Sequence, residues 1–111
     1  MPKLFIIGSK VALAADGVGE IKLDAPAELD FKGRAITIRS TGPFEIVEIT
    51  DSRGGSYMKG VIRGDQLDRM NDAGFLTDML DIAAKDYRVF KVRDVSATAN
   101  VVYIAIVGSV E

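Results

Sequence analysis

The sequence predicts a mostly β fold, a β-sandwich or small barrel with one short helix, on three observations. Short apolar runs rich in β-branched residues alternate with glycine, proline and aspartate turns along the chain. A single stretch, residues 72–85, has the 3.6-residue apolar period of an amphipathic helix. The chain of 111 residues is 48% hydrophobic and 27% charged, so we expect residues 1–111 to form a single globular domain.

The first strands are separated by turns that glycine and proline mark. We expect strand 4–7, a break at 8–9, strand 11–13, a turn at 16–19 and strand 20–23. The turn contains Gly17 and Gly19, and glycine adopts positive φ at little cost. Pro26 follows the last of these strands and ends it, because proline cannot donate a hydrogen bond to a sheet ladder.

The clearest strand pair lies in the middle of the chain. Arg34–Ser40 places Ile36 and Ile38 on one face and alternates them with smaller or polar residues. After the turn Thr41-Gly42-Pro43 comes Phe44–Thr50, which is apolar on both faces. Its apolar residues are Phe44 and Ile46 on one face, and Val47 and Ile49 on the other. These features predict a β-hairpin whose two faces are both covered, as in a sandwich.

The second half of the chain predicts one helix among further strands. The expected strands are residues 57–62, 88–92 and 101–107, and the expected flexible loop is 51–56. The helix spans Asp72–Lys85, with Asp72 as its N-cap and Lys85 favourably placed for the C-terminal dipole. No local pattern encodes strand order, so the sandwich and the barrel both stay open.

The chain contains no histidine and no cysteine. It therefore lacks the side chain that titrates near neutral pH, the best protein nucleophile and the usual zinc ligands. Its serines have no histidine base, and no Ser-x-x-Lys pair replaces one. We expect a non-enzymatic protein with no cofactor and no metal ion. The net charge of −2 argues against nucleic-acid binding, and no apolar run reaches the about 18 residues of a membrane helix.

Three patterns suggest chemistry, and each has a simpler structural explanation. Arg63-Gly64-Asp65 matches the tripeptide of integrin recognition, although we prefer to explain it as a turn with a surface aspartate after a strand. An oxygen-rich cluster, without the spacing or terminal glutamate of a calcium loop, is formed by Asp65, Asp68, Asn71 and Asp72. Glu45 and Glu48 could pair as general acid and base. Strand alternation predicts instead that they point to opposite faces, as edge charges that discourage aggregation.

Glycine loops and basic residues are interpreted as surface features. The loops 16–19 and 53–56 lack the Gly-Lys-Ser/Thr ending of a phosphate loop. Interleaved acids mostly cancel the basic residues, which are Arg34, Arg39, Arg53, Lys59, Arg63, Arg69, Arg88, Lys91 and Arg93. This favours a solvated or interfacial face over a nucleic-acid groove. Tyr57, Tyr87 and Tyr103 could stack on sugars or line a protein interface, although we prefer to explain them as half-buried strand residues.

The order of patterns along the chain resembles that of a group of viral proteins. Phe31–Ile38 (Phe-Lys-Gly-Arg-Ala-Ile-Thr-Ile) is followed by Phe44–Thr50, a glycine loop, Asp72-Ala73-Gly74-Phe75 and a closing apolar strand, Val101–Val107. Over residues 31–110 this layout resembles small phage virion proteins: capsid decoration, spike or fibre-base modules. The resemblance implies a compact β module that self-associates symmetrically and docks on a larger shell. The helix departs from it, because such modules often have only a loop there.

We therefore expect a homo-oligomeric structural protein, a capsid or tail accessory of a phage virion that is made in the host cytoplasm. Its partners would be further copies of itself and a capsid or tail protein, with no nucleic acid and no membrane. Symmetric assembly would cover edge strands. The candidate interface or core residues are Phe31, Phe44, Tyr57 and Tyr103, with Arg53 in the candidate contact loop 51–56.

Two alternatives stay open. A monomeric module that binds a ligand such as a carbohydrate would use tyrosines and loop carboxylates. An enzyme that uses only carboxylates, as glycosidases do, would bring two acids together in one cleft.

Overall fold

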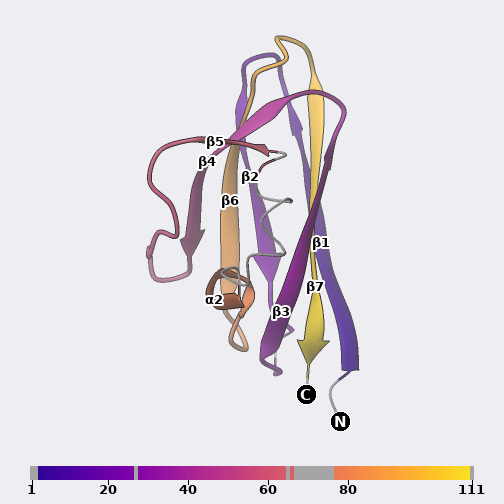
Figure 1. Cartoon of the computed structure of the whole chain (residues 1–111), viewed down its shortest axis with the longest axis vertical. Coiled ribbons are helices and arrows are strands. Elements are labelled where there is room, and N and C mark those ends of the chain that lie inside the picture. The colour runs from indigo at the N-terminus through magenta and orange to yellow at the C-terminus, as the bar shows by residue number, and fades with distance from the viewer. Residues whose placement is uncertain (1–2, 27, 65, 67–76, 111) are drawn as a thin grey trace.

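Two antiparallel sheets pack face to face in this protein (Figure 1). The structure, a computed structural model, describes residues 3–26, 28–64, 66 and 77–110. Sheet A consists, in order, of β1 (Lys3–Leu13), β7 (Asn100–Val110) and β3 (Phe31–Ser40). Sheet B consists, in order, of β2 (Val18–Asp24), β6 (Tyr87–Asp94), β4 (Phe44–Asp51) and the short β5 (Ile62–Arg63). The predicted mostly β fold is confirmed, and the two separate sheets make it sandwich-like rather than a closed barrel.

Three tight turns carry the chain from one sheet to the other at the same end of the molecule, which we call the turn end (Figure 1). Residues 14–17 join β1 to β2, residues 41–43 join β3 to β4, and residues 95–99 join β6 to β7. The predicted hairpin of 34–40 with 44–50 is therefore wrong, because β3 pairs with β7 and β4 pairs with β6. A Gly-Pro turn suits both arrangements, and stepping between sheets buries the inner faces of both strands.

The last two strands of the chain are central. β6 lies between β2 and β4, and β7 lies between β1 and β3. All of β1 pairs in register with β7, from Lys3 opposite Val110 to Leu13 opposite Asn100. The break predicted at residues 8–9 is absent, because this continuous ladder keeps β1 extended throughout.

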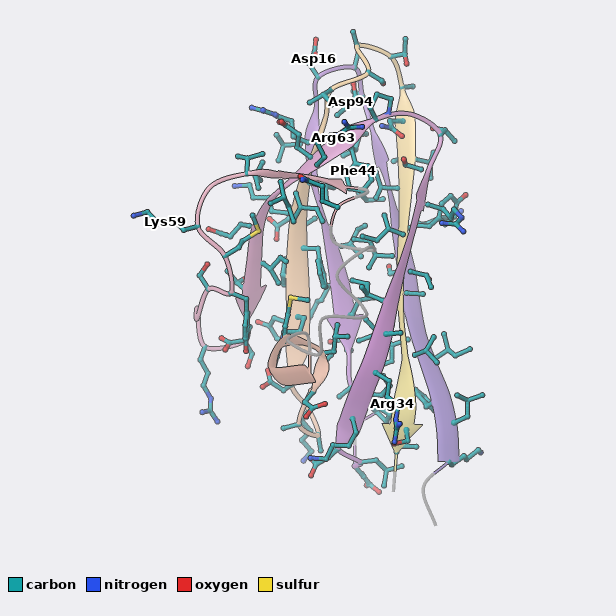
Figure 2. The ribbon with its side chains drawn as sticks, in the orientation of Figure 1. Asp16, Arg34, Phe44, Lys59, Arg63 and Asp94 are labelled. Atoms are coloured by element: carbon teal, nitrogen blue, oxygen red, sulfur yellow. The ribbon has the colours of Figure 1, made fainter. Side chains whose placement is uncertain are left out.

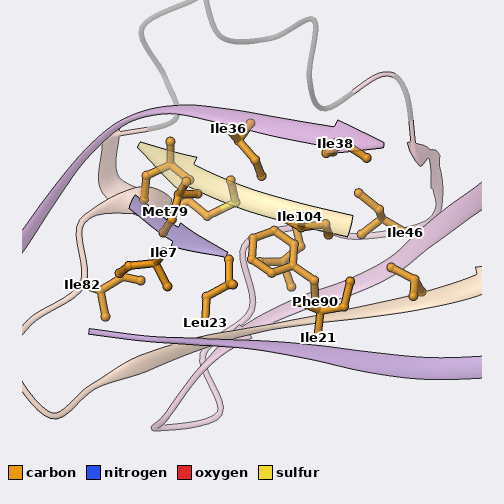
Figure 3. Close-up of a cluster of buried hydrophobic side chains, with 14 of the residues drawn as sticks. Ile7, Ile21, Leu23, Ile36, Ile38, Ile46, Met79, Ile82, Phe90 and Ile104 are labelled. Carbon is orange, nitrogen blue, oxygen red and sulfur yellow. The ribbon is translucent and has the colours of Figure 1, made fainter. Parts of the chain in front are cut away.

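The core lies between the two sheets, where side chains from both inner faces meet (Figure 3). Ile36, Ile38 and Ile104 from sheet A face Ile21, Leu23 and Phe90 from sheet B. All six are buried. Each such side chain contributes about 1.5–3 kcal/mol to stability by leaving water, so this layer holds the sheets together.

The predicted helix Asp72–Lys85 is wrong at its C-terminal end. The described part of it, α2 (Thr77–Leu80), stops at Leu80 and packs against β3. Ile82 then pairs with Phe31: each backbone N–H donates to the other residue's carbonyl, at 2.9 and 2.8 Å. This sheet-like pairing prevents the helix from continuing, and Lys85 has φ 66°. Residues 72–76 of the prediction lie outside the described residues.

The connection between β4 and β5 contains less strand than expected. Of the predicted strand 57–62, only Ile62 belongs to β5, whereas Ser56 forms an isolated bridge with Thr50. Gly60 has φ 89°, a conformation that glycine adopts readily and that reverses the chain before β5.

Candidate interaction surface

A buried polar cluster joins the three turns at the turn end, where Figure 2 shows Asp16 and Asp94. Asp94 and Asn100, which end β6 and begin β7, are each 1% exposed. Asp94 Oδ2 accepts from the backbone N–H of Asp16 at 2.9 Å, and Oδ1 accepts from Ser96 and from Asn100. These hydrogen bonds, led by that of the Ser96 hydroxyl, hold the pKa of Asp94 well below its ordinary value.

Asn100 completes this cluster with its side-chain amide. Its Nδ2 donates to the carbonyls of Gly42 and Pro43 at 3.0 and 3.1 Å. Its Oδ1 accepts from Gly42 N–H at 3.0 Å and from the Thr41 hydroxyl at 3.1 Å. Within the described residues, no buried side-chain nitrogen or oxygen lacks a partner. The cluster is therefore a structural link between the turns, with its hydrogen-bonding capacity already used by protein groups.

Arg88 has a comparable role at the end of the sandwich opposite the turn end. Its guanidinium is buried and donates to the carbonyls of Met79 and Asp81 at 2.9 and 2.7 Å. The Tyr57 ring lies over it, 5.1 Å from centroid to Cζ, and Asp86 is 3.8 Å away. The side chain thus satisfies the carbonyls where α2 ends and attaches this segment to β6.

Glu45 and Glu48 lie on the same outer face of sheet B, so the prediction of opposite faces is wrong. A β-bulge makes Val47 an extra residue in β4, which shifts the alternation by one position. Glu45 then lies opposite Arg93 and forms an ion pair with it, and Glu48 lies opposite Lys91. Each acid therefore has a neighbouring cation on β6, and this face is a mixed-charge, solvated surface.

The five candidate interface residues divide into two groups. Phe31 and Phe44 are 1% and 4% exposed and belong to the core. Tyr57, Tyr103 and Arg53 are exposed at the surface. Tyr57 and Tyr103 belong to different parts of the fold, since one follows β4 and the other stands on β7.

The loop that contains Arg53, the candidate contact loop, has a defined turn structure. Asp51 Oδ1 accepts from the backbone N–H groups of Gly55 and Arg53, each at 2.9 Å. Gly54 has φ 81° at the tip of the loop. The two N–H donors lower the pKa of Asp51 below its ordinary value.

The remaining sequence motifs give no site in the described residues. Gly64 of the Arg63-Gly64-Asp65 tripeptide is buried so closely against Phe44 that a Cβ there would lie 2.1 Å from the ring. Asp65 is outside the described residues, as is the whole predicted oxygen-rich cluster of Asp65, Asp68, Asn71 and Asp72. Within the described ranges, no three acids gather as metal ligands would.

The outer face of sheet A is apolar and open. Leu4, Ile6 and Tyr103 stand on it with exposed fractions of 69%, 59% and 46%. Side chains that alternate with the core positions of β1, β7 and β3 form rows across the sheet, because register aligns them. One such row is Ile6, Val107 and Ala35.

A shallow hollow of about 410 Å³ crosses this face. Two neighbouring rows produce it. The small-residue row, which forms much of the floor, contains Gly8, Ala105 and Thr37. The tyrosine row beside it contains Lys10, Tyr103 and Arg39. The Lys10 ammonium lies 5.8 Å from the Tyr103 ring centroid, so an aromatic ring between two cations borders the hollow.

Sheet A is cationic although the chain has a net charge of −2. Its strands carry exposed cations at Lys3, Lys10, Lys32, Arg34 and Arg39. None of β1, β3 and β7 contains a carboxylate residue. Figure 2 shows Arg34 towards the end of the sheet opposite the turns. The outer face of sheet A therefore combines exposed apolar area with positive charge, which suits an anionic partner surface that has an apolar centre.

Comparisons with known proteins identify no relative of this chain. Within the described residues, no helix has the length and apolar character needed to cross a bilayer. The chain matches no protein-family model, no curated protein and no solved structure.

Proposed function

We propose that this protein is a non-enzymatic assembly component that forms a homo-oligomer through the outer face of sheet A. One observation carries the proposal: Leu4, Ile6 and Tyr103 stand exposed on a continuous sheet face. Soluble monomers seldom leave an extended apolar face open to water. Covering such a face removes apolar area from water, which favours association.

The setting that we propose is a phage virion, with the protein as a capsid or tail accessory that also docks on a capsid or tail protein. The strand-rich fold and the element order of residues 31–110 support this setting through their resemblance to small virion modules. The two polar clusters use their groups within the protein, which favours a structural role.

The solution mass tests the self-association. Size exclusion with light scattering over a concentration series should give a wild-type mass that is a multiple of the single chain. Ile6→Glu places a charge on the open face and should reduce the mass to one chain. Val61→Glu changes an apolar residue that is 52% exposed outside sheet A, and should keep the wild-type mass. A wild-type protein with the mass of one chain at every concentration would contradict the proposal.

A second candidate function, a monomeric ligand-binding module, is favoured by the hollow beside Tyr103. An aromatic ring between Lys10 and Arg39 suits a sugar that carries a carboxylate, because the ring stacks and the cations pair. Titration with neutral and acidic oligosaccharides, monitored by tyrosine fluorescence, distinguishes this function. Saturable binding by a monomer that Tyr103→Ala abolishes would favour it over assembly.

A further inference from the structure

The open face of sheet A can be matched to one surface of a second copy of the chain. We propose that the segment Glu28–Asp30 of a neighbouring copy, which we call the acidic tip, inserts Leu29 into the hollow beside Tyr103. This inference rests on the proposed self-association and specifies the contact that produces it.

Charge excludes the simplest alternative, in which two copies pack sheet A against sheet A. The strands of sheet A carry cations and no carboxylate. Two-fold packing would bring Lys10 and Arg39 of both copies into one interface, and the strands of sheet A would supply no carboxylate there. Like charges that meet in an interface suppress association. An anionic occupant avoids this repulsion.

The acidic tip has the required chemistry. It lies in the connection from β2 to β3, at the end of the sandwich opposite the turn end. Leu29 is 37% exposed and stands between Glu28 and Asp30 in the chain. Large exposed hydrophobic side chains of the described residues also include Leu4, Ile6, Val18, Tyr57, Val61, Val95 and Tyr103, and none of these has an acid on both sides.

The tip is also held in place and available for contact. Asp30 Oδ1 accepts from the backbone N–H of Ala84 at 2.9 Å, which fixes the tip against the segment after α2. Within the described part of the chain, the ion pairs are Lys22–Asp24, Arg88–Asp86 and Arg93–Glu45. Neither carboxylate of the tip is used in them. The tip is already ordered and neither of its acids is in one of these ion pairs, so it needs little rearrangement to bind.

The hollow offers this tip an open apolar floor and opposite charge. It is a shallow depression of about 410 Å³. Gly8 and Ala105 leave room on its floor for an aliphatic side chain, and the Tyr103 ring forms one wall. Lys10 and Arg39 lie on either side of Tyr103 in the same row, where they can pair with the carboxylates that flank Leu29.

The contact is head-to-tail, because the hollow and the tip are different surfaces of one molecule. Every copy offers one hollow and one tip, so each can bind two neighbours. Such heterologous contacts close into a ring when the rotation between copies permits it, and otherwise extend into a filament.

Two complementary variants test the contact. Lys10→Glu/Thr37→Glu makes the hollow acidic and leaves the tip intact. Glu28→Lys/Leu29→Lys makes the tip basic and leaves the hollow intact. By size exclusion with light scattering, each variant alone should have the mass of one chain. A 1:1 mixture should regain a mass above one chain, because the intact tip of one variant meets the intact hollow of the other, and the reversed tip and reversed hollow are again opposite in charge.

The matched control is Lys59→Glu/Val61→Glu, which changes the net charge by the same amount as the hollow variant, on the connection before β5. It should keep the wild-type mass. Assembly in the mixture shows that both test variants are folded, and circular dichroism during heating confirms this for each alone.

Several results would overturn the inference. If the wild type assembles and the tip variant alone keeps the wild-type mass, the contact does not use the tip and the proposed assembly function survives. If both variants are single chains and their mixture stays so, the head-to-tail contact is wrong. If the wild type is a single chain throughout, the contact and the proposed function both fail. A change in the elution volume of that single chain with polygalacturonate, absent for Lys10→Glu/Thr37→Glu, would then assign the hollow to a foreign acidic saccharide.

Discussion

Asp94 shows how a single side chain can connect distant parts of this chain. Its carboxylate binds the first turn through Asp16 N–H, its own turn through Ser96 and the last strand through Asn100. The spacing Asp94-x-Ser96 is typical of a side-chain-stabilised turn and could have been noticed in the sequence. The burial of Asp94 could not have been predicted, because its hydrogen bond to Asp16 depends on strand pairing between residues far apart in the chain.

We expect Asp94 to make the protein less stable in acid. Its pKa in the folded state lies below the ordinary value of 3.8. The stabilisation is therefore complete well above that value and is lost as the pH falls through it towards the folded pKa. Urea unfolding at a series of pH values between about 6 and 2.5 measures this loss. The free energy of unfolding should fall more steeply for wild type than for Asp94→Asn.

The variant should keep part of the acid dependence, because Asp51 and Asp86 also have lowered pKa values in the folded state. Parallel curves for wild type and Asp94→Asn would show that the Asp94 carboxylate contributes no pH-dependent stability.

At the scale of elements, the alternation of apolar residues predicts where strands lie, but it does not predict which strands pair with each other. The stretches 20–23, 88–92 and 101–107 are all extended, each within a slightly longer strand. Alternation failed in β4, where the bulge at Val47 reverses the faces of the residues that follow. Helical periodicity failed after Leu80, because pairing of Ile82 with Phe31 outweighs local helix propensity.

The contact between α2 and β3 predicts a strong effect at Gly33. A Cβ at this position would lie 2.3 Å from Leu80 Cβ and 2.5 Å from its carbonyl oxygen, so Gly33→Ala forces the two elements apart. We expect a loss of about 1–3 kcal/mol in the free energy of unfolding, measured by urea denaturation. Gly8→Ala is the control, since its Cβ would meet Ala105 at an ordinary 3.4 Å, and both variants are compared in the Ile6→Glu background because Gly8 also lines the proposed contact. Equal stability of the two variants would contradict this packing.

At the scale of the whole molecule, the candidate surface depends on strand order, which the sequence does not reveal. β1 and β3 look like separate basic segments, and the acids near them in the chain suggest that their charges cancel. Pairing of both strands with β7 aligns Lys10, Tyr103 and Arg39 in one row. Tyr103 was a candidate interface residue from sequence alone, whereas its cationic neighbours across the sheet could not be assigned to it.

Pairing of Lys3 with Val110 predicts that the chain tolerates circular permutation. Antiparallel partners lie about 5 Å apart, so a short glycine linker can join the two ends. A permutant opened between Arg53 and Gly54, in an exposed loop, should keep its midpoint of thermal unfolding within about 10 °C. One opened between Gly42 and Pro43 disturbs the bonds to Asn100 and should melt lower. Equal midpoints by circular dichroism would show that the turn-end cluster adds little.

The central positions of β6 and β7 have a consequence for synthesis. On the ribosome β1 to β4 emerge first. Their central partner strands, β6 and β7, are missing until residues 87–110 appear. Neither sheet can form without its central strand, so we expect the nascent chain to stay unfolded until β6 and β7 leave the exit tunnel. Folding then completes both sheets together, and a chain cut short before β6 is a substrate for proteases rather than a smaller domain.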